Sequence, residues 1–560
     1  MNIKKFVLII FCFYVLVSCS VKEENGNTEP GKTVELNKRL EGFIRVWGFL
    51  KYYSNDVSRG KIDWDNVLIE AYPNIKNSAD YDNFNSEIGK MIDKAGKNSV
   101  SQNNGSPSNE TQADDDLYAW IDDSSVFKSN IIQQLHSVRN SLNATSNYYA
   151  IINSIGVPTF KNEIPFASPA FPEENVRILS LARFWNIINY YYPYKDGMPQ
   201  DWDDVLEEFI PRFISASDQL QYNLTVVELL VHITDSHGVY SSDAINSYFG
   251  MYNAPFEIRY IENKTIITRV FSDILEPAGA IKIGDIIVKC KNTDIDTYRA
   301  NVRKYIPGSN EPTIQRNIDN NIISYTTKQI PFTILRDGQT FEITLTGLTG
   351  PQYAAEQNKL NALNEKWKIL PGNIGYINMG ILQVSDVHVI MPQLMDTKAI
   401  IFDVRNYPNG TMYHICNYLI PTPISFALIA VSDPSKPGTF TFSNTMEATQ
   451  SANENYYKGK IILLVDERTQ SHAEFTCMAL QTAPDCTVIG SQTAGADGNI
   501  TSVKLPGGII AVFTGIGIYY PDQTPTQRIG IVPDITIRPT VSGIREGVDE
   551  ILQRALDFLN

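Results

Sequence analysis

The sequence predicts a multidomain protein of mixed α/β and α+β class, and three observations carry this prediction. At 560 residues the chain is too long for one hydrophobic core. An aromatic-rich helical segment occurs twice in the N-terminal half, and residues 251–348 have the pattern of short strands joined by turns. Residues 365–560 alternate apolar strands with helices. We therefore expect a duplicated helical module, a small β domain and a layered α/β domain, in that order.

The first residues have the pattern of a secretion signal. A basic start is followed by an apolar run over residues 6–17, which is too short to cross a membrane comfortably. The run ends in Leu-Val-Ser-Cys, which resembles the lipobox of bacterial lipoproteins and implies lipidation of Cys19. We expect residues 1–19 to be a lipoprotein signal peptide, with a plain secretory signal as the alternative, and residues 20–34 to be a polar tether. The expected location is the cell envelope, by a lipid anchor in the outer membrane, on its periplasmic face or at the cell surface.

Charge and composition exclude several classes of partner. The net charge of −15, with no basic cluster, argues against nucleic acid. No His/Asp/Glu cluster has metal-ligand spacing and no glycine loop suits a phosphate, so no metal or cofactor is expected. The sequence carries no indication of an oligomeric state. Four cysteines beyond the leader lie in apolar contexts and are expected as buried free thiols, with a Cys477–Cys486 disulfide as the alternative in an oxidising compartment: Cys290, Cys416, Cys477 and Cys486.

The helical segment is an internal repeat. Residues 39–73 align without a gap to residues 177–211, and the recurring positions are mostly tryptophan, tyrosine, aspartate and arginine. We expect residues 35–150 to form copy one and residues 170–245 to form copy two, with the aromatic residues in the core rather than in a sugar-binding platform. In each copy an Asp-Trp-Asp sequence starts the second helix. Asp63 and Asp201 are its predicted N-caps.

The two copies end differently. Copy one ends in Lys-Asn-Ser, whereas copy two ends in Asp235-Ser236-His237-Gly238. The helical fold does not require the latter sequence, because copy one lacks it. His237 is therefore a candidate functional residue.

The middle of the chain resembles a PDZ domain, a module that binds peptide C-termini at a sheet edge. The resemblance rests on Ile-Lys-Ile-Gly-Asp-Ile-Ile, in which Gly284-Asp285 precedes an apolar strand, and on a predicted hairpin turning at Asp337-Gly338. The alternative for residues 251–348 is a generic small β-barrel or sandwich.

Ser471 lies where a buried strand, residues 461–465, turns into a helix. A serine there is a favoured N-cap, and Glu474 three residues later completes a capping box. The same position holds an exposed hydroxyl near the helix N-terminus, where backbone N–H groups favour developing negative charge. The local pattern leaves both roles open.

Three further segments place Ser471 in context. Residues 403–410 (Asp-Val-Arg-Asn-Tyr-Pro-Asn-Gly), 469–474 (Thr-Gln-Ser-His-Ala-Glu) and 530–534 (Gly-Ile-Val-Pro-Asp) resemble motifs of the tail-specific, or C-terminal-processing, serine proteases, including the core of the tricorn protease. With the PDZ-like segment, the resemblance covers roughly residues 225–560. It implies a ClpP/crotonase-like peptidase core and Ser471 as the nucleophile.

The resemblance also indicates which base is used. Many members have a lysine in a turn after the serine, but here Ala496 occupies that position. Lys504, the nearest later lysine, is expected on a strand facing solvent. Tricorn-like members instead use a Ser-His pair before the PDZ domain, and Ser236-His237 stands at that place. His237 is thus the implied base, with Ser236 helping to orient the imidazole.

The remaining site residues follow from the same resemblance. Backbone N–H groups of His472 and of Gly410, or its neighbour Asn409, would form the oxyanion hole. The late glutamate of the tricorn-like tetrad would fall near Gln527, which hydrogen bonds but carries no charge. Two acids are open as substitutes, Asp235 and Asp522.

The sequence thus predicts a lipid-anchored serine endopeptidase that cleaves peptides or unfolded protein tails presented by the PDZ-like domain. The main alternative is a catalytically inactive peptide- or ligand-binding lipoprotein on the same scaffold. Glycan capture by the aromatic repeats is a third possibility.

Overall fold

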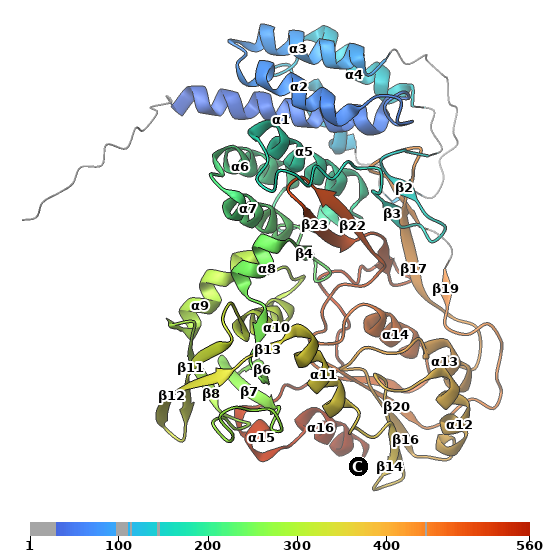
Figure 1. The fold of residues 1–560 in the computed structure, drawn as a ribbon. Coiled ribbons are helices and arrows are strands. Elements are labelled where there is room, and N and C mark those ends of the chain that lie inside the picture. Colours follow the sequence, from blue (N-terminus) through green and yellow to red (C-terminus); the bar gives the residue numbers. More distant parts are fainter. Residues whose placement is uncertain (1–29, 97–109, 112–114, 143–145, 443–444) are drawn as a thin grey trace, which may run out of the picture.

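The computed structural model describes residues 30–96, 110–111, 115–142, 146–442 and 445–560 (Figure 1). The predicted signal peptide, Cys19 and most of the tether lie outside the described residues. Among the helices described, none is long and apolar enough to cross a membrane.

The N-terminal half is helical and forms the top of the molecule in Figure 1. Asp63 and Asp201 each accept a hydrogen bond from the first turn of the helix that follows, which confirms both predicted N-caps. Copy one contains α1 (Pro30–Tyr53), α2 (Trp64–Lys76), α3 (Tyr81–Lys94), η1 (Asp115–Asp122) and α4 (Ser129–Asn140). Copy two contains α5 (Glu174–Tyr191), η2 (Lys195–Gly197), α6 (Trp202–Ser215) and α7 (Gln219–Val231). Short strands β2 (Ile151–Ile152) and β3 (Pro158–Thr159) pair between them.

Each copy is closed by a reciprocal pair of tryptophans. The Trp47 indole donates to the carbonyl of Trp64, and the Trp64 indole donates to the carbonyl of Trp47, both at 2.9 Å. Trp185 and Trp202 repeat this exchange at 2.7 and 3.0 Å. All four side chains are buried, so the repeated aromatics are core residues as predicted.

The two copies also pack against each other reciprocally. Arg183 of copy two binds Asp65 of copy one at 2.6 Å, and the equivalent Arg45 binds Asp203 at 3.0 Å. Exchange of equivalent partners in both directions is the mark of an isologous, two-fold-like interface. Where α1 and α5 cross, Gly48 lies against Asn186, its own equivalent in the other copy.

The crossing point predicts an unusual response to a helix-favouring substitution. Gly48→Ala would normally stabilise a helix by about 1 kcal/mol, but here the new Cβ would lie 1.9 Å from the Asn186 amide. Asn186 is held by bonds to the carbonyls of Ile44 and Ala182, so it has no room to move. We expect Gly48→Ala to lower the unfolding midpoint, and Gly89→Ala, whose Cβ would meet only Ile131 at 3.6 Å, to leave it unchanged or raise it. A thermal shift in the opposite order would contradict this packing.

The middle of the chain is a β domain whose six-stranded sheet has the order β12-β11-β8-β7-β6, with β9 beside β8. The predicted hairpin is confirmed, because β11 and β12 are antiparallel and turn at Asp337-Gly338. The sheet strands are β6 (Phe256–Ile261), β7 (Lys264–Val270), β8 (Ile286–Cys290), β9 (Thr293–Asp294), β11 (Gln329–Arg336) and β12 (Gln339–Thr346). A small sheet joins β5 (Tyr252–Asn253), β10 (Ser324–Tyr325) and β13 (Leu348–Thr349). The helices are α8 (Asp243–Phe249), α9 (Ile295–Val302), η3 (Arg303–Tyr305), α10 (Glu311–Ile322) and α11 (Gly350–Asn361).

The C-terminal domain is layered around a six-stranded sheet of order β14-β15-β16-β20-β21-β25. All its neighbours are parallel except β14 with β15. Its strands are β14 (Trp367–Leu370), β15 (Ile374–Asn378), β16 (Ala399–Asp403), β20 (Lys460–Val465), β21 (Cys486–Gly490) and β25 (Ile535–Thr536). Its helices are α12 (Val384–Leu394), α13 (Met412–Leu419), α14 (His472–Leu480), α15 (Val541–Glu546) and α16 (Glu550–Leu559).

Smaller sheets join this domain to the rest of the chain. β22 and β23 form a hairpin, and β4 of copy two adds to its edge antiparallel to β23. These strands are β4 (Val239–Ser241), β22 (Ile500–Leu505) and β23 (Ile509–Thr514). A further sheet contains β1 (Glu110–Thr111), β17 (Ser425–Ser432), β18 (Phe440–Phe442), β19 (Met446–Glu447) and β24 (Gly517–Tyr519).

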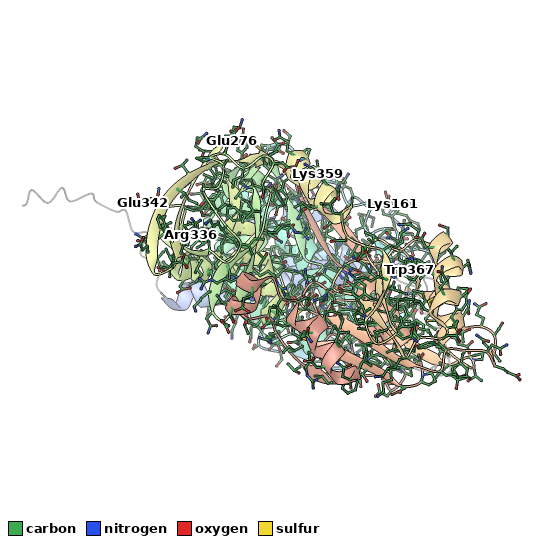
Figure 2. The ribbon with its side chains drawn as sticks, turned by 90° about the horizontal axis from the view of Figure 1, so that it is seen from below. Lys161, Glu276, Arg336, Glu342, Lys359 and Trp367 are labelled. Atoms are coloured by element: carbon green, nitrogen blue, oxygen red, sulfur yellow. The ribbon has the colours of Figure 1, made fainter. Side chains whose placement is uncertain are left out.

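Seen from below, the β domain and the C-terminal domain lie side by side (Figure 2). Arg336 and Glu342 mark the end of the β domain and Trp367 marks the opposite side. Cys290, Cys416 and Cys477 are buried free thiols, as predicted. Cys486 is a half-buried free thiol and is not bonded to Cys477.

Candidate active site

Two loops meet at one edge of the central sheet. β16 and β20 are adjacent and parallel, so the segments that follow them leave the sheet at the same edge. One segment leads to Gly410 and the other to Ser471. They are tied together by the Thr469 hydroxyl, which donates to the Val404 carbonyl at 2.8 Å.

Ser471 has a backbone conformation that is rare for a residue with a side chain. Its φ is +59° and its ψ is −124°, immediately before the first residue of α14. Such strained positions cluster at functional sites, because the surrounding structure must hold them. The residue therefore starts the helix, as the local pattern indicated, and it does so in a geometry that an ordinary N-cap does not need.

Glu474 holds this geometry in place. Its carboxylate is fully buried and accepts from the backbone N–H groups of Ser471, Gly495 and Ala496 at 3.2, 2.7 and 3.1 Å, as well as from the Thr493 hydroxyl. Burial raises the pKa of Glu474 above its ordinary value, and these hydrogen bonds oppose the rise. The turn of residues 493–496 is thus held by the Glu474 carboxylate.

His237 lies in a buried polar cluster with Asp235 and Thr514. Its Nδ1 is 2.9 Å from the Thr514 hydroxyl, which donates to Asp235 Oδ1 at 3.0 Å. The other Asp235 oxygen accepts from the Thr514 backbone N–H at 2.7 Å, and Oδ1 also accepts from the His237 backbone N–H at 2.9 Å. Burial lowers the pKa of His237 below 6.5, Asp235 opposes this shift and Arg316 adds to it.

The segments carrying Ser471 and His237 are hydrogen bonded to each other. Gln470 Nε2 donates to the Ser236 carbonyl at 3.1 Å, which joins the residues directly before Ser471 and His237. Both segments also bind one turn, because Ser236 Oγ donates to the Ala494 carbonyl and the Ser471 N–H donates to the Ala496 carbonyl, each at 2.9 Å.

The other residues that the sequence suggested for the site do not contact the His237 ring in the hydrogen bonds described. Gln527 is buried and donates to Asp235 Oδ1 at 3.3 Å, so it contacts the acid rather than the imidazole. Ser236 Oγ binds the Ala494 carbonyl and the Ser309 N–H, which is a structural position. Asp522 is exposed in its own turn and Lys504 faces solvent on β22, as expected for that lysine. Of the acids considered, Asp235 is the one that lies beside His237.

Two backbone N–H groups are free near Ser471. In the part of the chain that the structure describes, neither Gly410 nor His472 donates its N–H to another protein group. Gly410 has a φ of +70°, which glycine tolerates without strain, whereas Asn409 uses its side-chain amide to bind the carbonyls of Gly380 and Leu382. The His472 ring is half-buried and stacks on Phe475.

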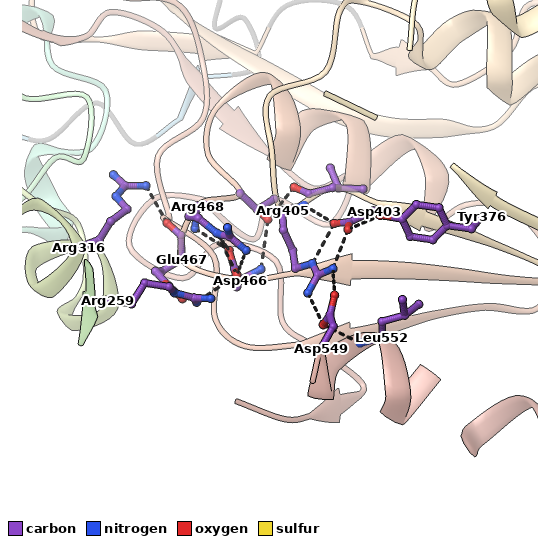
Figure 3. Close-up of polar contacts among 12 residues, drawn as sticks. Arg259, Arg316, Tyr376, Asp403, Arg405, Asp466, Glu467, Arg468, Asp549 and Leu552 are labelled. Atoms are coloured by element: carbon purple, nitrogen blue, oxygen red, sulfur yellow. Dashed lines mark hydrogen bonds and ion pairs between the residues drawn. The ribbon is translucent and has the colours of Figure 1, made fainter. Parts of the chain in front are cut away.

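The β domain contacts the segment that leads into Ser471 through two arginines (Figure 3). Arg259 on β6 binds the Glu467 carboxylate at 2.6 Å. Arg316 on α10 donates to the Glu467 carbonyl and to Gln470 Oε1, both at 2.7 Å. The strand β6 and the helix α10 of the β domain thus hold the residues just before Ser471.

A polar cleft of about 980 Å³ separates the β domain from the C-terminal domain. Its lining includes Arg259 and Arg316 of the β domain, and Tyr407 and Glu467 from the two loops described above. Ser471 itself does not line the cleft. Across the residues that the structure describes, no group of three or more metal-ligating side chains occurs.

Three residues that were not predicted as site residues hold the site together. Thr514 contacts His237, Glu474 contacts Ser471, and Arg316 contacts Gln470. Glu474 had a local signal, the capping box. Thr514 and Arg316 had no local sequence signal, because each residue is brought to the site only by tertiary packing.

Comparison with known proteins agrees with this architecture. Residues 373–537 match the model of peptidase family S41. No curated protein sequence matches the chain. Among solved structures, mature CPAF complexed with lactacystin has 12% identity and a TM-score of 0.51, covering 69% of this chain and 99% of that one.

Mature CPAF without that compound matches equally, with a TM-score of 0.51 over 68% of this chain and 96% of that one, also at 12% identity. A peptidase from Parabacteroides merdae has 16% identity over 70% of this chain and 97% of that one, with a TM-score of 0.43. Residues 373–537 thus form a domain of peptidase family S41, the tail-specific and C-terminal-processing peptidases, and the match identifies this domain as a serine-type peptidase.

Proposed function

We propose that the chain is an endopeptidase in which Ser471 is the nucleophile and His237 the general base, acting on peptides or unfolded protein tails. The observation that carries this proposal is the strained backbone of Ser471 at the start of α14, one residue from a hydrogen bond to the segment of His237. Strained backbone positions cluster at functional sites, and a nucleophile whose segment is hydrogen bonded to that of a buried histidine would account for the strain at Ser471.

The reaction is acyl transfer. His237 Nε2 takes the proton of Ser471 Oγ as this oxygen attacks the peptide carbonyl, and the carbonyl oxygen becomes negatively charged. The N–H groups of Gly410 and His472, which bind no other described protein group, would stabilise that charge. The imidazolium then gives its proton to the leaving amine, and an acyl-enzyme remains. Water, deprotonated by His237, releases the acyl group and restores Ser471.

Asp235 acts on His237 through Thr514. The arrangement that satisfies all three groups has His237 Nδ1–H donating to Thr514 Oγ1 and the Thr514 hydroxyl donating to Asp235. This leaves His237 Nε2 unprotonated, which is the tautomer that a general base needs. Gln527 donates to Asp235 and helps to keep the carboxylate in place.

The relay gives a testable prediction. In the wild type, hydrolysis should fall as pH drops through the pKa of His237, which burial holds below 6.5. Thr514→Val removes the link to Asp235, so kcat/KM should fall about 100-fold and the acid limb should move to lower pH, because the imidazolium loses stabilisation. Thr514→Ser keeps the hydroxyl and should restore both. A Thr514→Val enzyme with the wild-type rate and pH profile would remove Thr514 from the mechanism.

Substrate presentation by the β domain is part of the proposal. β6 ends the main sheet of this domain, and its residues Ile258 and Arg259 line the cleft. A peptide tail added to this edge, in the manner of a PDZ ligand, would lie across α10 and run toward the loops of Gly410 and Ser471. A lipid anchor at Cys19 would place the enzyme in the cell envelope, facing protein chains exported there.

The proposal is tested by covalent labelling combined with proteolysis. A fluorophosphonate should modify the full chain once, at Ser471, as seen by intact mass and peptide mapping, and should stop hydrolysis of an unstructured protein such as reduced, alkylated casein. Labelling at another serine would refute Ser471 as nucleophile. A folded chain that is neither labelled nor active on several unfolded proteins would instead favour the binding protein.

A further inference from the structure

A second pocket, of about 450 Å³, lies on the β domain at the junction of α8, α9 and the turn between β8 and β9. All its lining residues come from positions 248–331, so none belongs to the C-terminal domain. Its walls are aromatic, and Tyr248 at the rim is 46% exposed. The aromatic lining consists of Tyr248, Phe249, Tyr298, Tyr305 and Tyr325.

The pocket also contains one cation, Lys291. Its ammonium group lies over the rings of Tyr298 and Tyr325, 4.8 and 5.4 Å from their centroids. It donates to the Tyr298 hydroxyl at 2.6 Å and to the Asn321 carbonyl at 3.1 Å, which uses two of its three hydrogens. Lys291 forms no ion pair with any carboxylate in the described parts of the chain.

A half-buried ammonium without an anion is an unfavourable arrangement. Burial lowers the pKa of Lys291 to about 8, and the surrounding rings and neutral acceptors compensate only part of the lost hydration. The fully buried Lys51, by contrast, is paired with an acid, because its ammonium lies 2.8 Å from the Glu163 carboxylate. An anion that entered the pocket would meet a cation already desolvated on one side, and its apolar part would meet the aromatic walls.

We propose that this pocket binds a carboxylate carried on an aromatic body, with the carboxylate at the Lys291 ammonium and the ring among the pocket tyrosines. The chemistry is shared by free aromatic carboxylic acids and by a peptide chain that ends in an aromatic residue. The site is separate from Ser471 and does not depend on the peptidase mechanism.

The first test is calorimetric titration of the full chain at pH 7, where the lysine is protonated. The probe is 3-phenylpropionate, and 3-phenylpropanamide is the uncharged comparison. Binding of the acid should be saturable and at least tenfold tighter than binding of the amide, because a charge-assisted hydrogen bond is lost with the anion. Equal binding of both compounds, or no binding of the acid, would overturn the proposal.

Variants locate the site. Lys291→Met should weaken binding of the acid at least tenfold, whereas Lys289→Met, which removes an exposed lysine of β8 outside the pocket, should not. Because Lys291 has structural bonds, Thr326→Trp provides an independent block: Thr326 is exposed at the pocket and an indole there would fill it without touching the fold. If both pocket variants bind as the wild type does, the proposal is wrong.

A peptide arm distinguishes the two sources of ligand. A short peptide ending in phenylalanine is compared with its C-terminal amide, in the Ser471→Ala background so that the probe is not cleaved. Preference for the free peptide acid over 3-phenylpropionate would identify a chain end as the ligand. Preference for the small acid would identify a free aromatic acid. If Lys291→Met weakens binding of neither the peptide nor 3-phenylpropionate, the proposed site is wrong.

Discussion

Ser471→Ala and His237→Ala should each lower the rate of peptide hydrolysis by about 10⁴-fold or more, to a similar residual level. Removing the hydroxyl removes the nucleophile, and removing the imidazole leaves that hydroxyl without a group to take its proton. In the proposed mechanism the two residues act as one unit, so the double variant should be little worse than either single one. The measurement is kcat/KM on a quenched peptide, with folding verified by circular dichroism.

The control is His136→Ala, since His136 lies on α4 and pairs with Asp122 at the surface, far in sequence from both loops. It should retain wild-type activity. If Ser471→Ala is inactive and His237→Ala is active, the base lies elsewhere and Lys504 must be considered again. If Ser471→Ala retains activity, the nucleophile assignment itself fails.

Arg183→Met should be among the most destabilising single substitutions in the chain, at about 3–5 kcal/mol. Arg183 and Lys51 are both fully buried and share two acids, Asp65 and Glu163. Arg183 also donates to the carbonyl of Lys504 at 3.0 Å, which ties the helical module to β22. Removing the arginine leaves two buried carboxylates with Lys51 as their one remaining cation in this cluster. Such an uncompensated buried charge lowers the free energy of unfolding more than replacing the whole cluster by apolar residues would.

The duplication supplies a matched control for this substitution. Arg45 is the equivalent residue of copy one, but its partners Asp203 and Glu41 are 51% and 24% exposed at their side chains. Arg45→Met should therefore cost only about 1 kcal/mol. Urea unfolding followed by tryptophan fluorescence reports on both, because Trp47, Trp64, Trp185 and Trp202 lie in this module. Equal losses in the two variants would show that burial of the cluster does not matter.

The same cluster predicts a loss of stability in acid. Burial alone would raise the pKa of Asp65, but Lys51 and Arg183 together hold it below its ordinary value of 3.8. A carboxylate with a depressed pKa stabilises the folded chain above its unfolded pKa and loses this contribution as pH falls through the folded value. The urea concentration at the unfolding midpoint should therefore decrease when the pH is lowered below about 4. The decrease should be smaller in Arg183→Met, because part of this stabilisation is already absent in that variant.

Sequence reasoning was most successful where the determinants are local. The N-caps Asp63 and Asp201, the hairpin at Asp337-Gly338 and the strand-to-helix position of Ser471 depend on residues within a few positions of each other. Comparison of the two repeats singled out the Asp235-Ser236-His237 segment without any structure. These features were visible because turn and cap chemistry acts over short distances.

What sequence reasoning missed depends on contacts between distant segments. Thr514 belongs to a strand that pairs with β4, and only this pairing brings it to His237. Gln527 was expected at the place of the tetrad's late glutamate with no defined partner, and only the fold shows that it donates to Asp235. No periodicity or spacing encodes such contacts, since they are set by how three parts of the chain pack.

The pairing of β4 with β23 has a consequence for the size of the catalytic unit. The nucleophile segment lies within residues 373–537, but His237 and Asp235 enter from the helical half of the chain and are held there by that strand pair and by Thr514. Under the proposed mechanism, a truncated protein starting at residue 365 would keep Ser471 and lose its base. The proposed catalytic pair is therefore shared between the first and last halves of the chain, and we expect neither half alone to hydrolyse peptides.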